Sequence, residues 1–385
     1  MIKLKYFIQV SFIVAMLNLS LVPIFPRMAA FFGYIMIVSF WFYAFVGSFT
    51  NRHTKRIIIP LFIIIIISAI ISFHNFCDEE LRQKLITVIS FVAYYAALSF
   101  PNHVDNWGSV EFKIVQCFSA IMTVVFAVYA FVFPSIAYTP MGEYGNLVFT
   151  MGMGNPNGTA VCVLFVVMIL LLSFVSIKKI FCKLVILVSI GVLAYILYLL
   201  SSRTVFACFI FAVLCTFLIP LLKPNRFFRY IALFAPIIMI LLQFFLNEKI
   251  GNIQIFGKKL DTGRFEMYQE LLQQMDNEPL SSIFGNIFKY NFENFHNGVL
   301  TVFASLGAVG VIWLLRTWSM MLRRIEKKAE KKHQRLAYFF ILIFLFDAVA
   351  ESMTVVGTIP YGVFVCLMFK IAQCDSLVED KNALG

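Results

Sequence analysis

Apolar segments long enough to cross a lipid bilayer recur along the whole of this 385-residue chain. A membrane helix needs roughly 20 predominantly apolar residues, and polar, Gly and Pro residues separate the segments here. The pattern predicts about twelve transmembrane helices. We therefore expect an all-α, polytopic integral membrane protein in which residues 1–385 form a single membrane domain. The predicted spans are 6–24, 28–49, 57–75, 85–100, 112–133, 159–177, 184–201, 204–222, 230–247, 297–315, 336–354 and 358–372.

The composition agrees with this pattern, because 61% of the residues are hydrophobic and only 13% are charged. Soluble chains average about 45–50% apolar and about 25% charged residues. The first segment has a basic start and an apolar run, as a signal peptide does. It lacks a small-residue cleavage site, and Pro23 and Pro26 interrupt it. We interpret it as a retained first span.

The eight Cys and five His residues are scattered, without C-x-x-C or H-x-x-x-H spacing. Free Cys in apolar segments packs as a small hydrophobic residue. The pattern predicts neither a disulfide framework nor a metal site, and we expect no cofactor.

The distribution of Lys and Arg predicts the orientation in the membrane. If both termini are cytoplasmic, most of the 31 basic residues lie in inner segments, as the positive-inside bias requires. The net charge of +11 then reports topology, and we expect no nucleic-acid partner. Five basic residues nevertheless lie in the large outer loop 248–296, where an anionic substrate would explain them.

This extracytoplasmic loop contains one short amphipathic helix. Thr262 can cap a helix from Gly263 to Met275, whose apolar face would lie on the outer membrane surface. The face consists of Phe265, Tyr268, Leu272 and Met275. Arg264 falls in the first turn, where free N–H groups and a guanidinium together suit an anion. The alternative is an Arg that extends to lipid headgroups.

Further polar residues stand at predicted outer helix ends. Arg203 follows two Ser residues, either as a second anion contact or as an interface anchor. Two guanidinium groups in one outer site would suit a diphosphate. Asn155 and Asn157 belong to an Asn-Pro-Asn-Gly turn, which is either a helix cap or a polar lip over a substrate groove.

His296 and Asn297 close the large loop at the start of the tenth span. Imidazole titrates near neutrality, so His296 could accept a proton from a hydroxyl, although an interfacial His can also be inert. Asp347 and Glu351 lie one turn apart in the eleventh span. Intramembrane carboxylates are candidates for function, and the alternative is a structural partner for an Arg.

Residues 140–312 resemble the O-antigen polymerase and O-antigen ligase superfamily, in which bacterial polysaccharide polymerases are found. The similarity consists of ordered short motifs. These are Gly154-Asn155-Pro156-Asn157, Ser202-Arg203-Thr204, Gly263-Arg264, Tyr268, Pro279, Gly285, His296-Asn297, Leu300, Gly307 and Gly310. Two features depart from the family: residues 133–160 lack an Arg that many members carry, and Tyr268 stands where Trp is common.

The resemblance implies a glycosyltransferase of the bacterial inner membrane. Arg203 and Arg264 would hold the diphosphate of an undecaprenyl-linked oligosaccharide, and His296 would activate the acceptor hydroxyl. To these residues our reading of the sequence adds Asn155, Asn157 and Asn297 as expected substrate contacts. It also adds Tyr268, Asp347 and Glu351 as expected support for the site. The expected reaction is metal-independent and inverting. It would extend an O-antigen or a capsule, beside a chain-length regulator and a flippase.

Two alternatives remain. A ligase would transfer the glycan to a lipid A core instead of a second lipid-linked oligosaccharide. The 248–296 loop is short for housing a second large lipid acceptor, which favours the polymerase. A transporter of lipid-linked glycans is the alternative class, favoured by the span count and by Asp347 and Glu351. The absence of an internal repeat and the polarity of the outer loops favour the enzyme.

Overall fold

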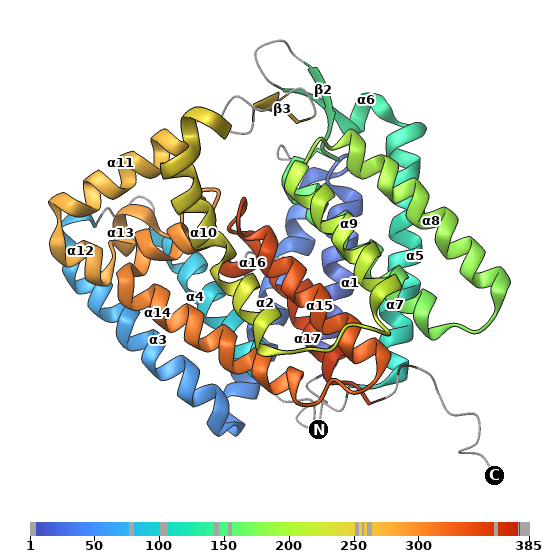
Figure 1. Cartoon of the computed structure of the whole chain (residues 1–385), viewed down its shortest axis with the longest axis horizontal. Coiled ribbons are helices and arrows are strands. Elements are labelled where there is room, and N and C mark those ends of the chain that lie inside the picture. Colours follow the sequence, from blue (N-terminus) through green and yellow to red (C-terminus); the bar gives the residue numbers. More distant parts are fainter. Residues whose placement is uncertain are drawn as a thin grey trace.

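The computed structural model describes residues 5–76, 81–100, 107–141, 146–152, 156–250, 254–255, 258–259, 264–357, 361–375 and 377. Within these residues a helix lies at each of the twelve ranges that the apolar pattern predicts (Figure 1). The helices are α1 (Lys5–Leu21), α2 (Pro26–Thr50), α3 (Arg52–Ile71), α4 (Leu81–Leu98), α5 (Ser109–Phe131), α7 (Pro156–Ser176), α8 (Ile180–Leu199), α9 (Arg203–Leu218), α10 (Arg226–Ile250), α14 (Gly298–Glu326), α15 (Lys332–Asp347) and α17 (Tyr361–Gln373).

Among the described residues, seven helices are long and apolar enough to cross a membrane: α2, α3, α5, α7, α8, α10 and α14. Helices α1, α9 and α17 are apolar but shorter. The chain is thus a mostly helical membrane protein, while the number of crossings stays a prediction. The seventh and eighth predicted spans are separate helices, because Ser201 adopts a left-handed conformation with φ 51° in the turn between α8 and α9.

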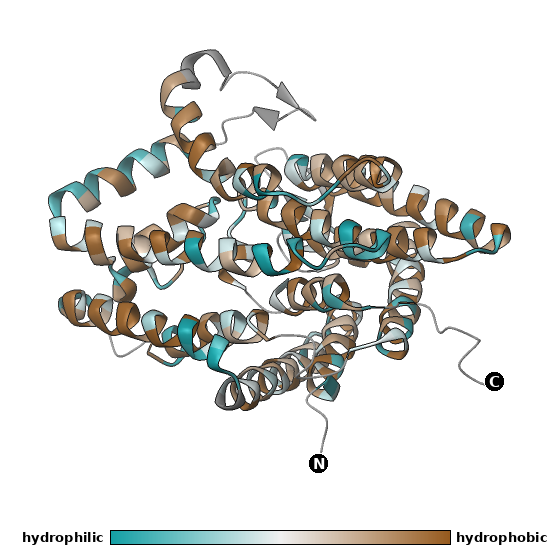
Figure 2. Ribbon diagram, turned by 60° about the horizontal axis from the view of Figure 1, so that its bottom comes forward, coloured by the Kyte–Doolittle hydropathy of each residue, from teal (hydrophilic) through white to brown (hydrophobic). Residues whose placement is uncertain are grey.

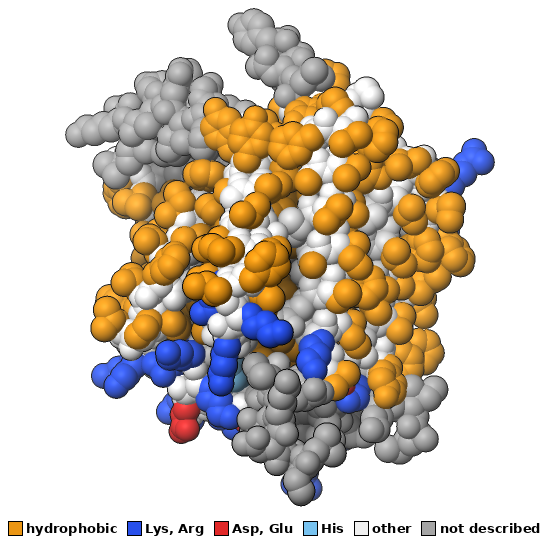
Figure 3. Space-filling model, turned by 90° about the vertical axis from the view of Figure 1, so that its right-hand side faces the viewer, with side chains coloured by type: hydrophobic (Ala, Val, Ile, Leu, Met, Phe, Trp, Pro, Cys, Tyr) orange, Lys and Arg blue, Asp and Glu red, His pale blue; other side chains and the backbone are white. Residues whose placement is uncertain are grey.

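The outer surface of the helix bundle is apolar, as lipid contact requires. Figure 2 shows hydrophobic residues along most helices, and Figure 3 shows an apolar face with Lys and Arg gathered towards its lower edge. Many large apolar side chains are exposed among the described residues, including Ile180 at 77% and Phe245 at 81%. Such exposure would be costly in water and is favourable in lipid.

Helix α7 lies at the centre of the bundle. It packs against α5, α8, α9 and α15, and 89% of its apolar window is buried. Every residue from Gly158 to Ser173 is buried. Its Thr159 hydroxyl donates a hydrogen bond to the carbonyl of Thr150, so the segment before α7 is tied to its first turn. The position of α7 therefore fixes the residues at its start relative to α15.

Shorter elements join the long helices. The segment between α5 and α7 contains an antiparallel hairpin, in which Tyr138 pairs with Phe149. The short elements are η1 (Phe73–Asn75), α6 (Pro134–Ala137), β1 (Tyr138–Met141), β2 (Asn146–Phe149), β3 (Gln254–Ile255), β4 (Lys258–Lys259), α11 (Arg264–Asn277), α12 (Pro279–Phe284), α13 (Ile287–Tyr290) and α16 (Met353–Val356).

Helix α14 is broken at Gly307, where φ is 66° and ψ is −168°. A side chain there would meet the Ile283 carbonyl oxygen at 2.3 Å, so only Gly permits the close approach of α12. The carbonyl of Ala304 accepts the N–H of Asn286, and the carbonyl of Ser305 accepts the Ser68 hydroxyl.

Helix α15 ends at Asp347, seven residues before the predicted end of its span. Residues 348–350 continue as turns, and the N–H of Gly298 donates to the carbonyl of Ala348. We call this end of the bundle, with residues 134–141, 146–152, 156–157, 200–203, 264–298 and 347–357, the loop end. The opposite end, with residues 175–180, 219–226 and 326–333, is the basic end. The hairpin and α11 lie towards the top of Figure 1.

Candidate functional site

The carboxylate of Glu351 lies at the centre of a polar cluster at the loop end. Its Oε1 accepts a hydrogen bond from the Asn157 side-chain amide at 2.5 Å. Its Oε2 accepts one from the Asn294 side-chain amide at 3.1 Å. His296 Nδ1 lies 3.4 Å from Oε1, and Arg264 Nη2 lies 3.9 Å from the same oxygen. These four groups come from α7, α11 and the segment before α14, so the fold assembles the cluster from distant parts of the sequence.

The break after α15 places Glu351 in this position. Its N–H donates to the carbonyl of Asp347, which continues the helical turn for four residues. The next residue, Ser352, donates its hydroxyl to the Asn294 side-chain oxygen at 2.8 Å. Asn294 therefore accepts from Ser352 and donates to Glu351, and it links the turn after α15 to the loop that carries His296.

The backbone of His296 is held in a left-handed conformation, with φ 51°. Its N–H donates to the Asn294 side-chain oxygen at 2.9 Å, and its carbonyl accepts the Tyr268 hydroxyl at 3.2 Å. A non-Gly residue in this region costs about 1–3 kcal/mol and persists where its surroundings hold it. Tyr268 thus contacts the backbone of His296 from α11, and its role in a site stays a prediction.

Hydrogen bonds hold the loop before His296 against α14. Phe292 donates its N–H to the Ser305 hydroxyl at 2.7 Å, and its ring stacks on Phe91 at 4.2 Å. The N–H of Phe295 donates to the Thr301 hydroxyl at 3.3 Å. Ser305 and Thr301 both lie in the part of α14 before the Gly307 break. The imidazole is consequently positioned by a rigid helix although it stands on a loop.

The side chains of His296 and Glu351 differ in their exposure to solvent. The His296 side chain is 38% exposed, whereas that of Glu351 is 2% exposed. A ligand at this end of the bundle can therefore touch the imidazole, while the carboxylate is covered by its partners. Because Nδ1 faces Glu351, Nε2 is the imidazole nitrogen that remains for a ligand. A carboxylate beside one imidazole nitrogen can orient the ring.

Arg203 and Arg264 begin α9 and α11, and their positive charges act on each other. The structure thus brings together the two arginines that the sequence assigns to one outer site. The 3.9 Å contact of Arg264 with Glu351 is longer than a hydrogen bond, so their attraction is electrostatic. Helix N-termini carry partial positive charge, and α7, α9, α11 and α14 all begin at the loop end. The cluster could therefore bind an anion at the two arginines, beside His296 as a base.

Asn297 serves the helix instead of a ligand. It is fully buried, and its side-chain oxygen accepts the N–H groups of Val299 and Leu300 as the cap of α14. Its amide donates to the carbonyl of Pro236 at 3.1 Å. The predicted substrate contact is corrected here, because oxygen and amide are both used within the protein.

The Asn-Pro-Asn turn also differs from its prediction. Helix α7 begins at Pro156, so Asn157 is its second residue and not its cap, and its amide is directed to Glu351. Asn157 is therefore a neighbour of the buried carboxylate. Asn155 lies outside the described residues, and its predicted substrate contact stays a prediction.

Asp347 is completely buried as the last residue of α15. Within the described part of the chain, neither carboxylate oxygen has a hydrogen-bond partner. Glu351 and Arg264 both act electrostatically on this group. A buried carboxyl without a hydrogen bond is costly, so Asp347 is a further polar element of the same region, one turn from Glu351.

The predicted amphipathic helix is present as α11, but its apolar face packs on protein. Tyr268, Leu271 and Met275 are buried with Leu300 and Ala304 of α14. The expectation that this face lies on the membrane surface was wrong for these side chains, and Leu271 takes the place expected of Leu272. This packing holds α11 against the first turns of α14. As a result, Arg264, the first residue of α11, lies near His296.

Sequence reasoning missed Asn294 and Ser352. Asn294 stands two residues before His296, and Ser352 directly follows Glu351, so proximity to candidate residues was the available signal. Neither belongs to a motif of its own. Their roles depend on contacts between segments 57 and 58 residues apart.

Comparisons with known proteins place this chain in no family: no family model matches it, and neither does any curated protein. The geometry of the cluster and the motif resemblance are therefore the two grounds on which a function can be assigned.

Proposed function

We propose that this protein is a bacterial inner-membrane glycosyltransferase that polymerises undecaprenyl-diphosphate-linked oligosaccharide repeat units. The proposal takes the helices at the twelve predicted spans as crossings, with both termini cytoplasmic and the loop end outside. The reaction would be metal-independent and inverting, and its product would be an O-antigen or a capsule. Both substrates are amphiphilic, which suits a site at the boundary of the bilayer.

The contact between His296 and Glu351, with Arg264 beside them, carries this proposal. A partly exposed imidazole that a buried carboxylate orients is a suitable general base. A guanidinium at the same place can stabilise a leaving diphosphate. Glu351 itself is covered by Asn157 and Asn294, which favours His296 over Glu351 as the group that meets the acceptor.

In the proposed step, an acceptor hydroxyl transfers its proton to Nε2 of His296 while its oxygen bonds to the anomeric carbon of the donor. The bond between that carbon and the diphosphate breaks, and the electron pair leaves with the diphosphate. Attack from the face opposite the leaving group inverts the anomeric configuration. Arg203 and Arg264 offset the charge of the diphosphate, and Glu351 offsets that of the imidazolium.

A ligase would use the same chemistry with a lipid A core as its acceptor. The transporter alternative is favoured by two observations: α14 is broken at Gly307, and Asp347 is buried without a hydrogen bond among the described residues. Broken helices and buried carboxyls recur in transporters. At the break in α14, α12 packs against Gly307 and the Ser68 hydroxyl donates to the Ser305 carbonyl. These contacts favour a structural reason for the break.

The test is a reconstituted reaction. Purified protein in liposomes is given an undecaprenyl-diphosphate oligosaccharide of one repeat unit. Ladders of longer lipid-linked products with inverted linkages, formed equally well with a chelator, are expected. Transfer only to added lipid A core would establish a ligase instead. Movement of the unextended donor between leaflets, without any new glycosidic bond, would refute the enzyme.

A further inference from the structure

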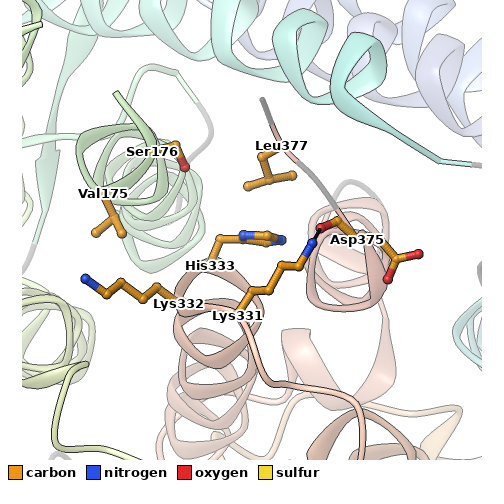
Figure 4. Close-up of a pocket in the computed structure, with 7 residues that line it drawn as sticks. All are labelled: Val175, Ser176, Lys331, Lys332, His333, Asp375 and Leu377. Atoms are coloured by element: carbon orange, nitrogen blue, oxygen red, sulfur yellow. Dashed lines mark hydrogen bonds between the residues drawn. The ribbon is translucent and has the colours of Figure 1, made fainter. Parts of the chain in front are cut away.

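A hollow of about 220 Å³ lies at the basic end, between α7, α15 and the segment after α17 (Figure 4). One water needs roughly 10–15 Å³ on this measure, so the hollow admits a group of many atoms. Val175 and Ser176 line it from α7, and Asp375 and Leu377 line it from the segment after α17. The remaining lining residues, Lys331, Lys332 and His333, are consecutive at the start of α15.

The polar side of the hollow is cationic. Lys331 donates from Nζ to the backbone carbonyl of Asp375. This hydrogen bond does not involve the Asp375 carboxylate. In Figure 4 the Asp375 carboxylate points away from the hollow. His333 Nε2 lies 2.9 Å from the carbonyl oxygen of Cys374, which holds the segment after α17 against α15. Lys331 and Lys332 thus place two ammonium groups on two sides of the hollow, and Figure 4 shows their side chains extending in opposite directions.

The other side of the hollow is apolar and adjoins the lipid-facing surface. Val175 and Leu377 supply aliphatic side chains. Ile180 and Phe181, which begin α8, are 77% and 74% exposed. A ligand with an anionic head and a hydrocarbon chain matches this division, because the chain could continue along the exposed face while the head stays between the lysines.

We propose that this hollow binds the phosphate headgroup of an anionic phospholipid. Ammonium groups bind phosphate as point charges, and basic hollows between membrane helices accept such headgroups. The positive charges of Lys331 and Lys332 attract the phosphate from two sides of the hollow, and Val175 and Leu377 contact the glycerol and the first methylenes. The site stands independently of the chemistry proposed at the loop end, since the two lie at opposite ends of α7 and α15.

Lipid binding to the full-length protein in detergent tests this proposal. Phosphatidylglycerol is titrated, and bound lipid is counted by native mass spectrometry together with the thermal denaturation temperature. Lys332→Gln should weaken binding of the tightest lipid about fivefold, which corresponds to about 1 kcal/mol. Lys331→Gln should add to this loss. The matched control is Lys223→Gln with Arg226→Gln, which removes two exposed charges at the same end outside the hollow.

The comparison ligands distinguish the sources of the phosphate. Phosphatidylcholine should bind weakly, because its headgroup is neutral overall, and inorganic phosphate should not reproduce the stabilisation. Equal binding by the control pair and the Lys332 variant, or equal effects of the two lipids, would overturn the proposal. Stabilisation by inorganic phosphate alone would assign the hollow to a soluble anion and would also refute the lipid. If Lys331→Gln unfolds, the Lys332 variant alone decides.

Discussion

The imidazole of His296 and the carboxylate of Glu351 meet across 55 residues of sequence, with Nδ1 3.4 Å from Oε1. The contact depends on where two helices begin and end: α15 ends at Asp347, and α14 begins at Gly298. Where these ends meet, the Gly298 N–H donates to the Ala348 carbonyl at 2.8 Å. The relation between the two side chains is therefore set by backbone contacts.

Replacing His296 tests its proposed role as the base. His296→Asn removes the imidazole, while Asn tolerates the left-handed backbone better than most residues. Because general-base catalysis contributes typically 10²–10⁴-fold, polymerisation in liposomes should fall by about that factor. The denaturation temperature should change little. His74→Asn, at an exposed His in η1, is the control and should retain activity. Near-normal polymer length in the His296 variant would exclude this base.

The pairing with Glu351 predicts coupled effects. Glu351→Gln keeps the size of the side chain but removes the charge that orients and stabilises the imidazolium. The rate should fall, and the further loss caused by His296→Asn should be smaller in this background than in the wild type. Coupled neighbours give interaction energies of about 0.5–3 kcal/mol in such cycles. Rates of all four proteins measure the coupling, and strictly additive losses would show that the residues act separately.

The two arginines should be sensitive to a change that keeps their charge. Arg203→Lys and Arg264→Lys lose the planar fork that binds phosphate oxygens in pairs. A hydrogen bond to a charged group contributes about 1.5–3 kcal/mol, so turnover should fall roughly 10- to 100-fold. Arg82→Lys, an exposed position at the start of α4, is the control. Protein amounts are compared by immunoblot, and full activity of either Lys variant would remove that arginine from the site.

The break in α14 predicts a strong dependence on one glycine. Gly307→Ala places a methyl group 2.3 Å from the Ile283 carbonyl oxygen in a backbone conformation that suits only Gly. The backbone alone should cost about 1–3 kcal/mol, and a lower denaturation temperature in detergent should report it. Gly191→Ala is the contrast, because nothing lies within 4 Å of the place that its new methyl group would take and Ala favours helix. Equal stability of both variants would contradict the observed packing.

The proposed orientation can be tested with single cysteines. In a variant without the eight native Cys residues, Glu293→Cys at the loop end should react with a membrane-impermeant maleimide added to intact cells. Lys328→Cys at the basic end should react only after the membrane is opened. Both native side chains are exposed, so access to reagent depends on the side of the membrane. The reverse pattern would place the polar cluster inside the cell.

Sequence patterns predicted the helices well, because a run of apolar residues long enough for a bilayer leaves the backbone few alternatives to a helix. They failed where a helix stops inside such a run. Residues 348–354 are mostly apolar, yet α15 ends at Asp347 because the carbonyl of Ala348 pairs with Gly298 of another helix. No pattern within residues 336–354 reports that partner.

The sequence indicated which residues belong to the candidate site, but it did not indicate which of them contact one another. Arg264 and His296 stood out because charge and a titratable ring are unusual beside apolar segments. The contact of Asn157 with Glu351 joins residues 194 positions apart, and only the packing of α7 against α15 creates it. Asn297 stood out for the same reason as His296, but burial turned its amide to the backbone.

The order of the residues around Glu351 also bears on how the protein is made. Chains are synthesised from the amino terminus, and Asn157, Arg264, Asn294 and His296 all precede Glu351. A carboxylate is among the most costly groups to place in a bilayer. Here it leaves the ribosome after these four residues, whose side chains contact it in the finished protein. A nascent chain that stops before residue 351 already contains these partners, and the arrival of Glu351 completes the cluster.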